Sequence, residues 1–241
     1  MNKPWYKEWF NSPYYHLLYR HRDNEEAKIF LNNLQKALHF LPTYHILDLA
    51  CGRGRHSIYL NSLGFEVTGV DLSEANIRYA SQFQNNRLHF AIHDMKEVYK
   101  PQAFDVVLNL FTSFGYFRND EENQQVISSV CTMLKPGGIF VLDYLNVSPI
   151  QLDERIKEIE MDDMVFRIRK FAENDRIIKE IEVIDGKNRH FYYEKVKYYT
   201  AETLCKMIEK ESMKILHMYG NYQLSTFDPS VSERVIIVSA K

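Results

Sequence analysis

The stretch Ile46–Leu60, "ILDLACGRGRHSIYL", decides the fold. Its first residues are apolar enough for a short buried strand, and they stop at Gly52 and Gly54. The residues after Gly54 have the character of a helix. Glycine at such a turn permits positive φ and removes the Cβ that would keep a ligand away from the backbone. The stretch is therefore either a tight strand-to-helix turn or a loop that approaches a ligand, and its context has to decide.

Strands and helices alternate along most of the chain. Further strands are predicted at 65–71, 87–94, 104–111 and 139–145, with helices at 23–41, 54–63, 73–83 and 119–134. A helix at 200–211 and two antiparallel edge strands at 214–222 and 234–241 complete the pattern. This alternation implies right-handed crossovers and an α/β fold with a doubly wound, mainly parallel sheet.

Residues 147–199 have a different pattern, with strand-like stretches at 163–172, 176–185 and 188–199. The sequences "END" and "DGKN" between them are good hairpin turns. We therefore expect a three-stranded antiparallel insertion after the fifth strand. It is expected to belong to the domain formed by 1–146 and 200–241. Its position predicts a substrate cover, and a dimer surface is equally consistent.

Composition excludes several classes of protein. The chain has 241 residues, 45% of them hydrophobic and 26% charged, and a formal net charge of −2. It lacks the basic stripe of a nucleic-acid binder, so no nucleic-acid partner is expected. Cys51, Cys131 and Cys205 are too far apart to suggest a disulfide framework or a metal site. The aromatic, charged start is unlike a signal peptide, and no apolar run is long enough for a membrane span. We expect a cytoplasmic protein.

Acidic residues end the second and third strands of the predicted sheet. Ligands of such sheets bind at the carboxyl ends of the strands. Asp71 can accept hydrogen bonds from both hydroxyls of a ribose. Asp94, in "HDM", can accept from an exocyclic amine while the N–H of Met95 donates to a ring nitrogen. The alternatives are a helix cap at Asp71, a role that Ser73 fills better, and a loop-initiating Asp94.

An adenosine site leaves NAD, ATP and S-adenosylmethionine as ligands. The chain has no GxxxxGK[ST] phosphate-binding loop. The dinucleotide fingerprint needs a third small residue, and Arg55, His56 and Ser57 occupy that neighbourhood.

Five segments, in order over residues 45–146, resemble the motifs of class I S-adenosylmethionine-dependent methyltransferases. They are "LDLACGRGRH", "GVDLS", "HDM", "FDVVLNLF" and "LKPGGIFVLDYLN". "CGRGRHS" together with "NLFTSFGYF" is closest to the bacterial small-molecule type. The resemblance implies a seven-stranded Rossmann-like sheet, S-adenosylmethionine as cofactor and S-adenosylhomocysteine as product. Ala50 and His56 replace two of the motif's glycines, which leaves the contacts of Arg53, Arg55 and His56 open.

The resemblance also implies the cofactor contacts. They are Asp48 at the methionine amino group; Ala50, Cys51, Gly52 and Gly54 beside the sugar and methionine; Asp71 at the ribose; Leu72 on the adenine face; Asp94 and Met95 at the adenine edge; and Asn109 and Leu110 near the transferable methyl. As in similar enzymes, the aromatic segment within residues 1–41 is expected to form a lid over the cofactor; packing on a sheet edge is the alternative.

The implied reaction is in-line methyl transfer to a nitrogen or oxygen nucleophile of a small molecule. No residue has a motif that assigns it as the base. The polar candidates are Tyr14, Tyr116, Tyr144 and His190. Residues 109–112, Asn-Leu-Phe-Thr, lack the Pro-Pro-aromatic pattern typical of nucleobase and glutamine methylation. An RNA methyltransferase and a non-catalytic S-adenosylmethionine-binding regulator remain alternatives, and the chain is expected to be a monomer or a homodimer.

Overall fold

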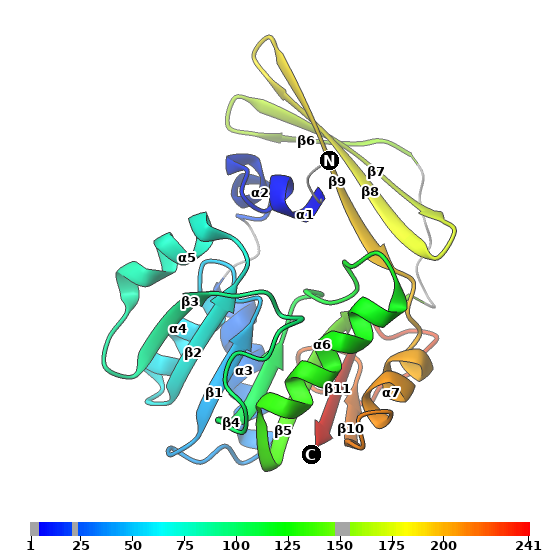
Figure 1. Ribbon diagram of the computed structural model, residues 1–241. Helices are drawn as coiled ribbons and strands as arrows, with labels where there is room; N and C mark the ends of the chain where they lie inside the picture. The colour runs from blue at the N-terminus through cyan, green and yellow to red at the C-terminus, as the bar shows by residue number, and fades with distance from the viewer. Residues whose placement is uncertain (1–4, 21–23, 148–154) are drawn as a thin grey trace. The chain divides into compact units, whose positions relative to one another are not determined.

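A computed structural model describes residues 5–20, 24–147 and 155–241 (Figure 1). The chain divides into two compact units. The larger comprises Asn24–Pro149 and Tyr199–Lys241, and the smaller comprises Met1–Asp23 and Ile150–Tyr198. Each unit is described by itself. Within the described ranges, no helix is both long and apolar enough to cross a membrane.

The larger unit is built on a seven-stranded sheet in the order β10-β11-β5-β4-β1-β2-β3. Its strands are β1 (His45–Leu49), β2 (Glu66–Asp71), β3 (Leu88–Ile92), β4 (Phe104–Asn109), β5 (Leu134–Leu145), β10 (Lys214–Tyr219) and β11 (Arg234–Ala240). Strands β1 to β5 pair in parallel, and β11 is antiparallel to both β5 and β10. This confirms the predicted doubly wound sheet with an antiparallel final pair. The strand order reverses between β1 and β4, which is where such sheets bind ligands.

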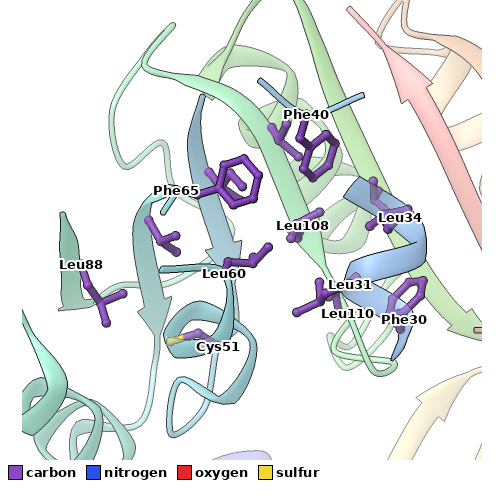
Figure 2. Close-up of a cluster of buried hydrophobic side chains, with 14 of the residues drawn as sticks. Phe30, Leu31, Leu34, Phe40, Cys51, Leu60, Phe65, Leu88, Leu108 and Leu110 are labelled. Carbon is purple, nitrogen blue, oxygen red and sulfur yellow. The ribbon is translucent and has the colours of Figure 1, made fainter. Parts of the chain in front are cut away.

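Helices cover this sheet. They are α3 (Asn24–Ala37), α4 (Arg55–Ser62), α5 (Glu74–Ala80), the short 3-10 helix η1 (Ser81–Phe83), α6 (Asp120–Met133) and α7 (Ala201–Glu209). Figure 2 shows Phe30, Leu31 and Leu34 of α3 in one buried cluster with Leu60 of α4 and Leu108 of β4. Helices α6 and α7 contact each other and the strands β5 and β11.

Polar side chains start three of these helices. The side-chain oxygens of Ser73, Asn119 and Thr200 each accept a hydrogen bond from the backbone N–H three residues later. Such caps satisfy donors that have no partner inside the helix. The predicted cap at Ser73 is confirmed. The helix predicted to reach residue 41 ends at Ala37 instead, shortly before the left-handed residue His39 (φ 50°). Asp23, the first residue of that predicted helix, lies outside the described residues.

The smaller unit contains a four-stranded antiparallel sheet. Its strands are β6 (Lys157–Met161), β7 (Met164–Glu173), β8 (Arg176–Asp185) and β9 (Asn188–Lys197), paired in sequence order. The prediction of three strands was wrong by one. Strand β6, "KEIEM", is missed because three of its five residues are charged and none is fully buried, so its apolar pattern is weak.

Two short N-terminal helices, α1 (Trp5–Trp9) and α2 (Pro13–Leu18), pack against this antiparallel sheet. Trp9 and Leu18 share a buried cluster with Phe166 of β7. The Trp9 Nε1 donates to Glu194 Oε1 at 2.8 Å, so a buried indole is also satisfied. This segment and the insertion belong to one compact unit. The predicted domain boundaries stay a prediction. The role of the insertion as substrate cover or dimer surface stays a prediction.

Candidate active site

The carboxyl ends of four parallel strands meet at one edge of the large sheet. Asp48 of β1 is in register with Gly69 of β2 and Leu108 of β4. Asp71, the last residue of β2, is in register with Ile92 of β3. The loops that follow these strands carry the predicted cofactor residues. The register therefore brings the predicted residues of β1, β2, β3 and β4 to a single edge.

The glycine loop between β1 and α4 has three residues in the left-handed region: Ala50 (φ 64°), Gly52 (φ 56°) and Gly54 (φ 81°). A Cβ added at Gly52 would meet no heavy atom within 4 Å. A Cβ added at Gly54 would lie 2.7 Å from the ring of Phe90. The sequence assigned both glycines to ligand approach. The structure gives Gly54 a packing reason and leaves only Gly52 beside open space.

Asp71 joins this loop to the next helix. Its Oδ2 accepts the Gly52 N–H at 2.9 Å, and its Oδ1 accepts the Ser73 N–H at 2.7 Å. Burial raises the pKa of the Asp71 carboxyl, and the two backbone donors oppose that rise. The Asn76 side chain also hydrogen-bonds this carboxylate, so three donors already occupy it, and its remaining acceptor capacity can bind a hydroxyl. The ribose role of Asp71 stays a prediction, and its backbone contacts show how the carboxylate is oriented.

Asp48 is a buried carboxylate, with 1% of the residue exposed. The Ser57 Oγ, in the first turns of α4, donates to its Oδ2 at 2.6 Å. Burial raises the pKa of Asp48 to about 6. A carboxylate in this state binds a cation readily, because a cation compensates its charge. Sequence reasoning missed Ser57 as its partner, and the only signal was a small polar residue on the first turn of the helix that follows the loop.

The residues after β3 form a tight turn. The Asp94 Oδ1 accepts the Lys96 N–H at 3.0 Å, and the His93 N–H donates to the Asp71 carbonyl at 3.0 Å. Asp94, Met95 and Leu72 are all partly exposed. Asp94 therefore initiates a turn, as the alternative expected, while its remaining lone pairs stay available for an amine. The adenine contacts stay a prediction.

Asn109 and Leu110 continue from the end of β4. Asn109 is fully buried, and its Nδ2 donates to the Leu49 carbonyl at 3.0 Å, which ties the ends of β4 and β1 together. The side chains of Leu110 and Cys51 belong to the core cluster (Figure 2). Burial raises the pKa of the Cys51 thiol well above its usual value, so this thiol stays protonated. Both residues therefore offer a ligand their backbone rather than their side chains.

Of the catalytic candidates, Tyr116 lies in the loop after β4 and Tyr144 lies near the end of β5. The Tyr116 hydroxyl donates to the Thr112 carbonyl at 2.5 Å. Tyr144 is fully buried beside Phe114, and a Cβ at Gly115 would lie 2.6 Å from its hydroxyl oxygen. The Tyr116 hydroxyl is therefore bonded to the backbone, and the Tyr144 ring is packed in the interior beside the buried ring of Phe114.

Tyr14 and His190 lie together in the smaller unit, with ring centroids 5.0 Å apart. The Tyr14 hydroxyl donates to Asp185 Oδ2 at 3.0 Å. Burial and the Asp185 carboxylate raise the pKa of Tyr14, which makes it a poor proton acceptor at neutral pH. The candidates therefore fall into two pairs on separate units. Their catalytic roles stay a prediction.

Arg53, Arg55 and His56 surround the start of α4. Arg55 lies over the Phe111 ring at 5.3 Å and its Nη2 lies 3.3 Å from His56 Nε2, while Arg53 lies over a tyrosine ring. Burial, with Arg55 nearby, lowers the pKa of His56 to about 3. The imidazole is therefore neutral at pH 7. Because a guanidinium only donates, Nε2 is the accepting nitrogen.

The comparisons with known proteins agree with this geometry. A family model described as "Methyltransferase domain" matches residues 46–138, the span from β1 to the first part of β5. Residues 46–138 are therefore similar to a methyltransferase domain. Of the described residues, no group of three or more His, Cys, Asp or Glu side chains could hold a metal ion.

Curated relatives match the methyltransferase domain. "Putative methyltransferase YqeM" of Bacillus subtilis is 40% identical over 101 residues, which cover 41% of each chain. "Glycine N-methyltransferase" of Oryctolagus cuniculus is 33% identical over 123 residues, covering 44% of this chain and 42% of the relative. The chain thus spans about two fifths of the length of these relatives.

A solved structure matches almost the whole chain. The S-adenosylmethionine-dependent methyltransferase from Clostridium acetobutylicum has a TM-score of 0.79 at 21% identity, over 94% of this chain and 95% of that one. At that identity the likeness shows the fold, and it confirms the Rossmann-like methyltransferase architecture. Together, the comparisons support S-adenosylmethionine as the cofactor of the methyltransferase domain.

Proposed function

We propose that this protein transfers a methyl group from S-adenosylmethionine to a nitrogen or oxygen atom of a small molecule. The observation that carries the proposal is the open position at Gly52, held by Asp71 and close in sequence to the buried carboxylate of Asp48. All three residues lie within the matched domain.

The donor set at the strand ends fits this cofactor. Asp48 supplies a buried anion for the methionine ammonium, and burial raises its pKa to about 6 even though the Arg55 charge opposes that rise. Asp71 supplies carboxylate oxygens for the ribose hydroxyls, and the backbone at Gly52 leaves room beside them. Asp94 and the Met95 N–H provide an acceptor and a donor for the adenine edge.

S-adenosylmethionine supplies an electrophilic methyl group on a sulfonium. The protein's contribution is then alignment, because an in-line displacement depends on the geometry of nucleophile, methyl and leaving group. Asn109 fixes the end of β4 against β1, where the methyl is expected. An amine acceptor needs to be deprotonated before it attacks, and it can lose that proton to solvent before it binds. The absence of an assigned base is therefore compatible with catalysis.

The first experiment measures cofactor binding by calorimetry. Wild type should bind S-adenosylmethionine and S-adenosylhomocysteine, and Asp71→Asn should weaken both at least about tenfold, because it removes a charged acceptor. Asp105→Asn is the matched control. Asp105 also accepts a backbone N–H, that of His45 at 2.8 Å, but it lies near the start of β4 rather than at the strand ends. No binding by wild type, or equal losses in both variants, would refute the cofactor site.

The second experiment identifies the acceptor class. Protein and S-adenosylmethionine with a labelled methyl group are incubated with fractionated small metabolites and, separately, with total RNA. Label in a small-molecule fraction supports the proposal. Label in RNA alone would establish the RNA methyltransferase alternative, and binding without transfer to either would establish a regulatory protein.

A further inference from the structure

The side chain of Asp143 lies at the centre of a buried hydrogen-bond network behind the candidate site. Asp143, two residues before the end of strand β5, is fully buried. Its Oδ2 accepts the Tyr222 hydroxyl at 3.0 Å, and its Oδ1 accepts Arg234 Nε at 2.8 Å and Nη2 at 2.6 Å. Arg234 is the first residue of β11, and Tyr222 precedes it in the connection from β10. Three parts of the chain thus meet at one carboxylate.

The fourth part is the loop after β4. The Asp143 Oδ2 also accepts the Phe111 N–H at 2.7 Å, and the Asp143 carbonyl accepts the Thr112 N–H at 3.0 Å. Arg234 Nη2 donates to the Thr112 hydroxyl at 2.9 Å. Both consecutive backbone amides of this loop are therefore fixed by Asp143, and the side chain of the second is fixed by Arg234.

Phe111 and Thr112 have an unfavourable backbone conformation. Their φ angles are 62° and 57°, and neither residue is glycine. A β-branched residue such as Thr112 is a clear outlier in the left-handed region. Such strain persists only where the surroundings hold it, and it clusters at functional sites. The hydrogen bonds of the network supply that constraint.

This strained pair directly follows the residues expected beside the transferable methyl. Phe111 comes two residues after Asn109. Its ring lies under the guanidinium of Arg55, the residue that directly follows the glycine loop. The conformation of residues 111 and 112 therefore decides where the backbone after β4 runs relative to the glycine loop. The network itself is buried and ion-paired, so Asp143 is not exposed to act as a base.

We propose that Asp143, Arg234 and Tyr222 are positioning residues that hold the strained Phe111–Thr112 backbone in the geometry required at the sulfonium methyl. This inference rests on the proposed function and adds residues to it. The three side chains act through the loop and do not touch the reacting atoms. The pair formed by Asp143 and Arg234 has no net charge, so it fixes the loop without changing the charge of the site.

The test compares binding of S-adenosylmethionine with that of S-adenosylhomocysteine, which differ only by the methyl and the positive charge at sulfur. Tyr222→Phe removes one hydrogen bond to Asp143 and keeps the ring that packs on Phe30. This variant should lower the affinity for S-adenosylmethionine about fivefold and the affinity for S-adenosylhomocysteine less than about twofold. Arg234→Lys cannot bond Asp143 and Thr112 with one rigid fork, so its ratio should change more.

Thr68→Val is the control. It removes a buried hydroxyl that bonds the His45 ring at 2.9 Å near the start of β2, and it should lower thermal stability without changing the ratio of the two affinities. An unchanged ratio in both Tyr222→Phe and Arg234→Lys, with normal wild-type binding, would overturn this inference alone. If Thr68→Val changes the ratio of the two affinities as much as Tyr222→Phe and Arg234→Lys do, the change reflects general stability. The inference is then also wrong. Absence of wild-type binding would instead refute the proposed function.

Discussion

Replacing Asp48 by asparagine should make the protein more stable at neutral pH and unable to hold the cofactor tightly. Asp48 is buried, and the structure offers its charge only the Ser57 hydroxyl as a side-chain hydrogen-bond donor among the described residues. Asparagine has nearly the same shape and keeps an oxygen for that hydroxyl. The substitution therefore removes the charge and leaves one acceptor oxygen for the two Ser57 donors, its hydroxyl and its backbone N–H.

The magnitude follows from the pKa of Asp48. A pKa raised from 3.8 to about 6 corresponds to about 3 kcal/mol against the ionised form at pH 7.5. In the unfolded chain the carboxyl ionises near pH 4, so the folded state binds the extra proton between pH 4 and 6. The penalty is absent below about pH 4, grows through that window, and is complete above about pH 6. Asp48→Asn should therefore stabilise the protein by about 1–3 kcal/mol at pH 7.5 and not at pH 4, allowing for the weaker bond from Ser57.

Urea denaturation of wild type and Asp48→Asn at pH 7.5, 5.5 and 4 measures this difference. A variant that is less stable than wild type at pH 7.5, or a difference that does not depend on pH, would refute the reasoning. Ser57→Ala serves as a control, because it removes the donor and should raise the pKa of Asp48 further.

The same carboxyl predicts how cofactor binding depends on pH. We propose that the methionine ammonium pairs with ionised Asp48, so binding should tighten as pH rises through about 6 and release the proton that Asp48 holds below it. Calorimetry in two buffers of different ionisation enthalpy at pH 5.5 detects that proton. In Asp48→Asn the affinity should be lower and independent of pH between 5 and 7.5. Proton release that persists in the variant would assign it to another group.

Further predictions concern the glycine loop and the smaller unit. Gly54→Ala should destabilise the protein by more than about 2 kcal/mol in urea denaturation, because its Cβ would meet Phe90 at 2.7 Å in a left-handed residue. Gly52→Ala should cost only about 1 kcal/mol for its positive φ but weaken S-adenosylmethionine strongly; equal stability losses would contradict the assigned difference. Glu194→Ala should speed amide hydrogen exchange in α1 by about tenfold, because the indole of Trp9 loses its acceptor, and should leave the large sheet unchanged. Unchanged exchange in α1 would show that apolar packing alone holds it.

The fold of the larger unit is predictable because each of its elements carries a local signal. The strand His45–Leu49 is buried on both faces, as expected for a strand covered by helices on each side. The sequence predicts Ser73 as a helix cap, and its side-chain oxygen accepts the Asn76 N–H in the structure. Strand β6 is the failure: its alternating charged residues are typical of an edge strand, and only pairing with Met164–Glu173 defines it. Packing of the N-terminal helices also has no local signal, since aromatic residues pack equally well on any apolar surface.

The candidate site is predictable to the level of residues but not of contacts. Asp71 and Gly52 stand out singly in the sequence, whereas the hydrogen bond that joins them depends on the register between β1 and β2. The Asp143 network is invisible for the same reason. Its hydrogen-bonded members are separated by up to 122 residues, and Phe111 takes part through its backbone, which no side-chain pattern reports.

Ion pairing separates the structural acids of the sheet from those assigned to the ligand. Asp105 is paired with Lys135 at 2.7 Å and Asp143 with Arg234 at 2.6 Å. Asp48 and Asp71 have no lysine or arginine partner within 4.0 Å among the described residues, and burial raises the pKa of each. A carboxylate shielded from water without a cation destabilises a fold, so the buried Asp48 and the half-buried Asp71 at one sheet edge require a compensating role. The proposed cationic, hydroxyl-bearing ligand would supply that compensation with an ammonium for Asp48 and a diol for Asp71. S-adenosylmethionine carries both groups, and this match, more than the glycines, connects the geometry of the strand ends to the methyltransferase domain.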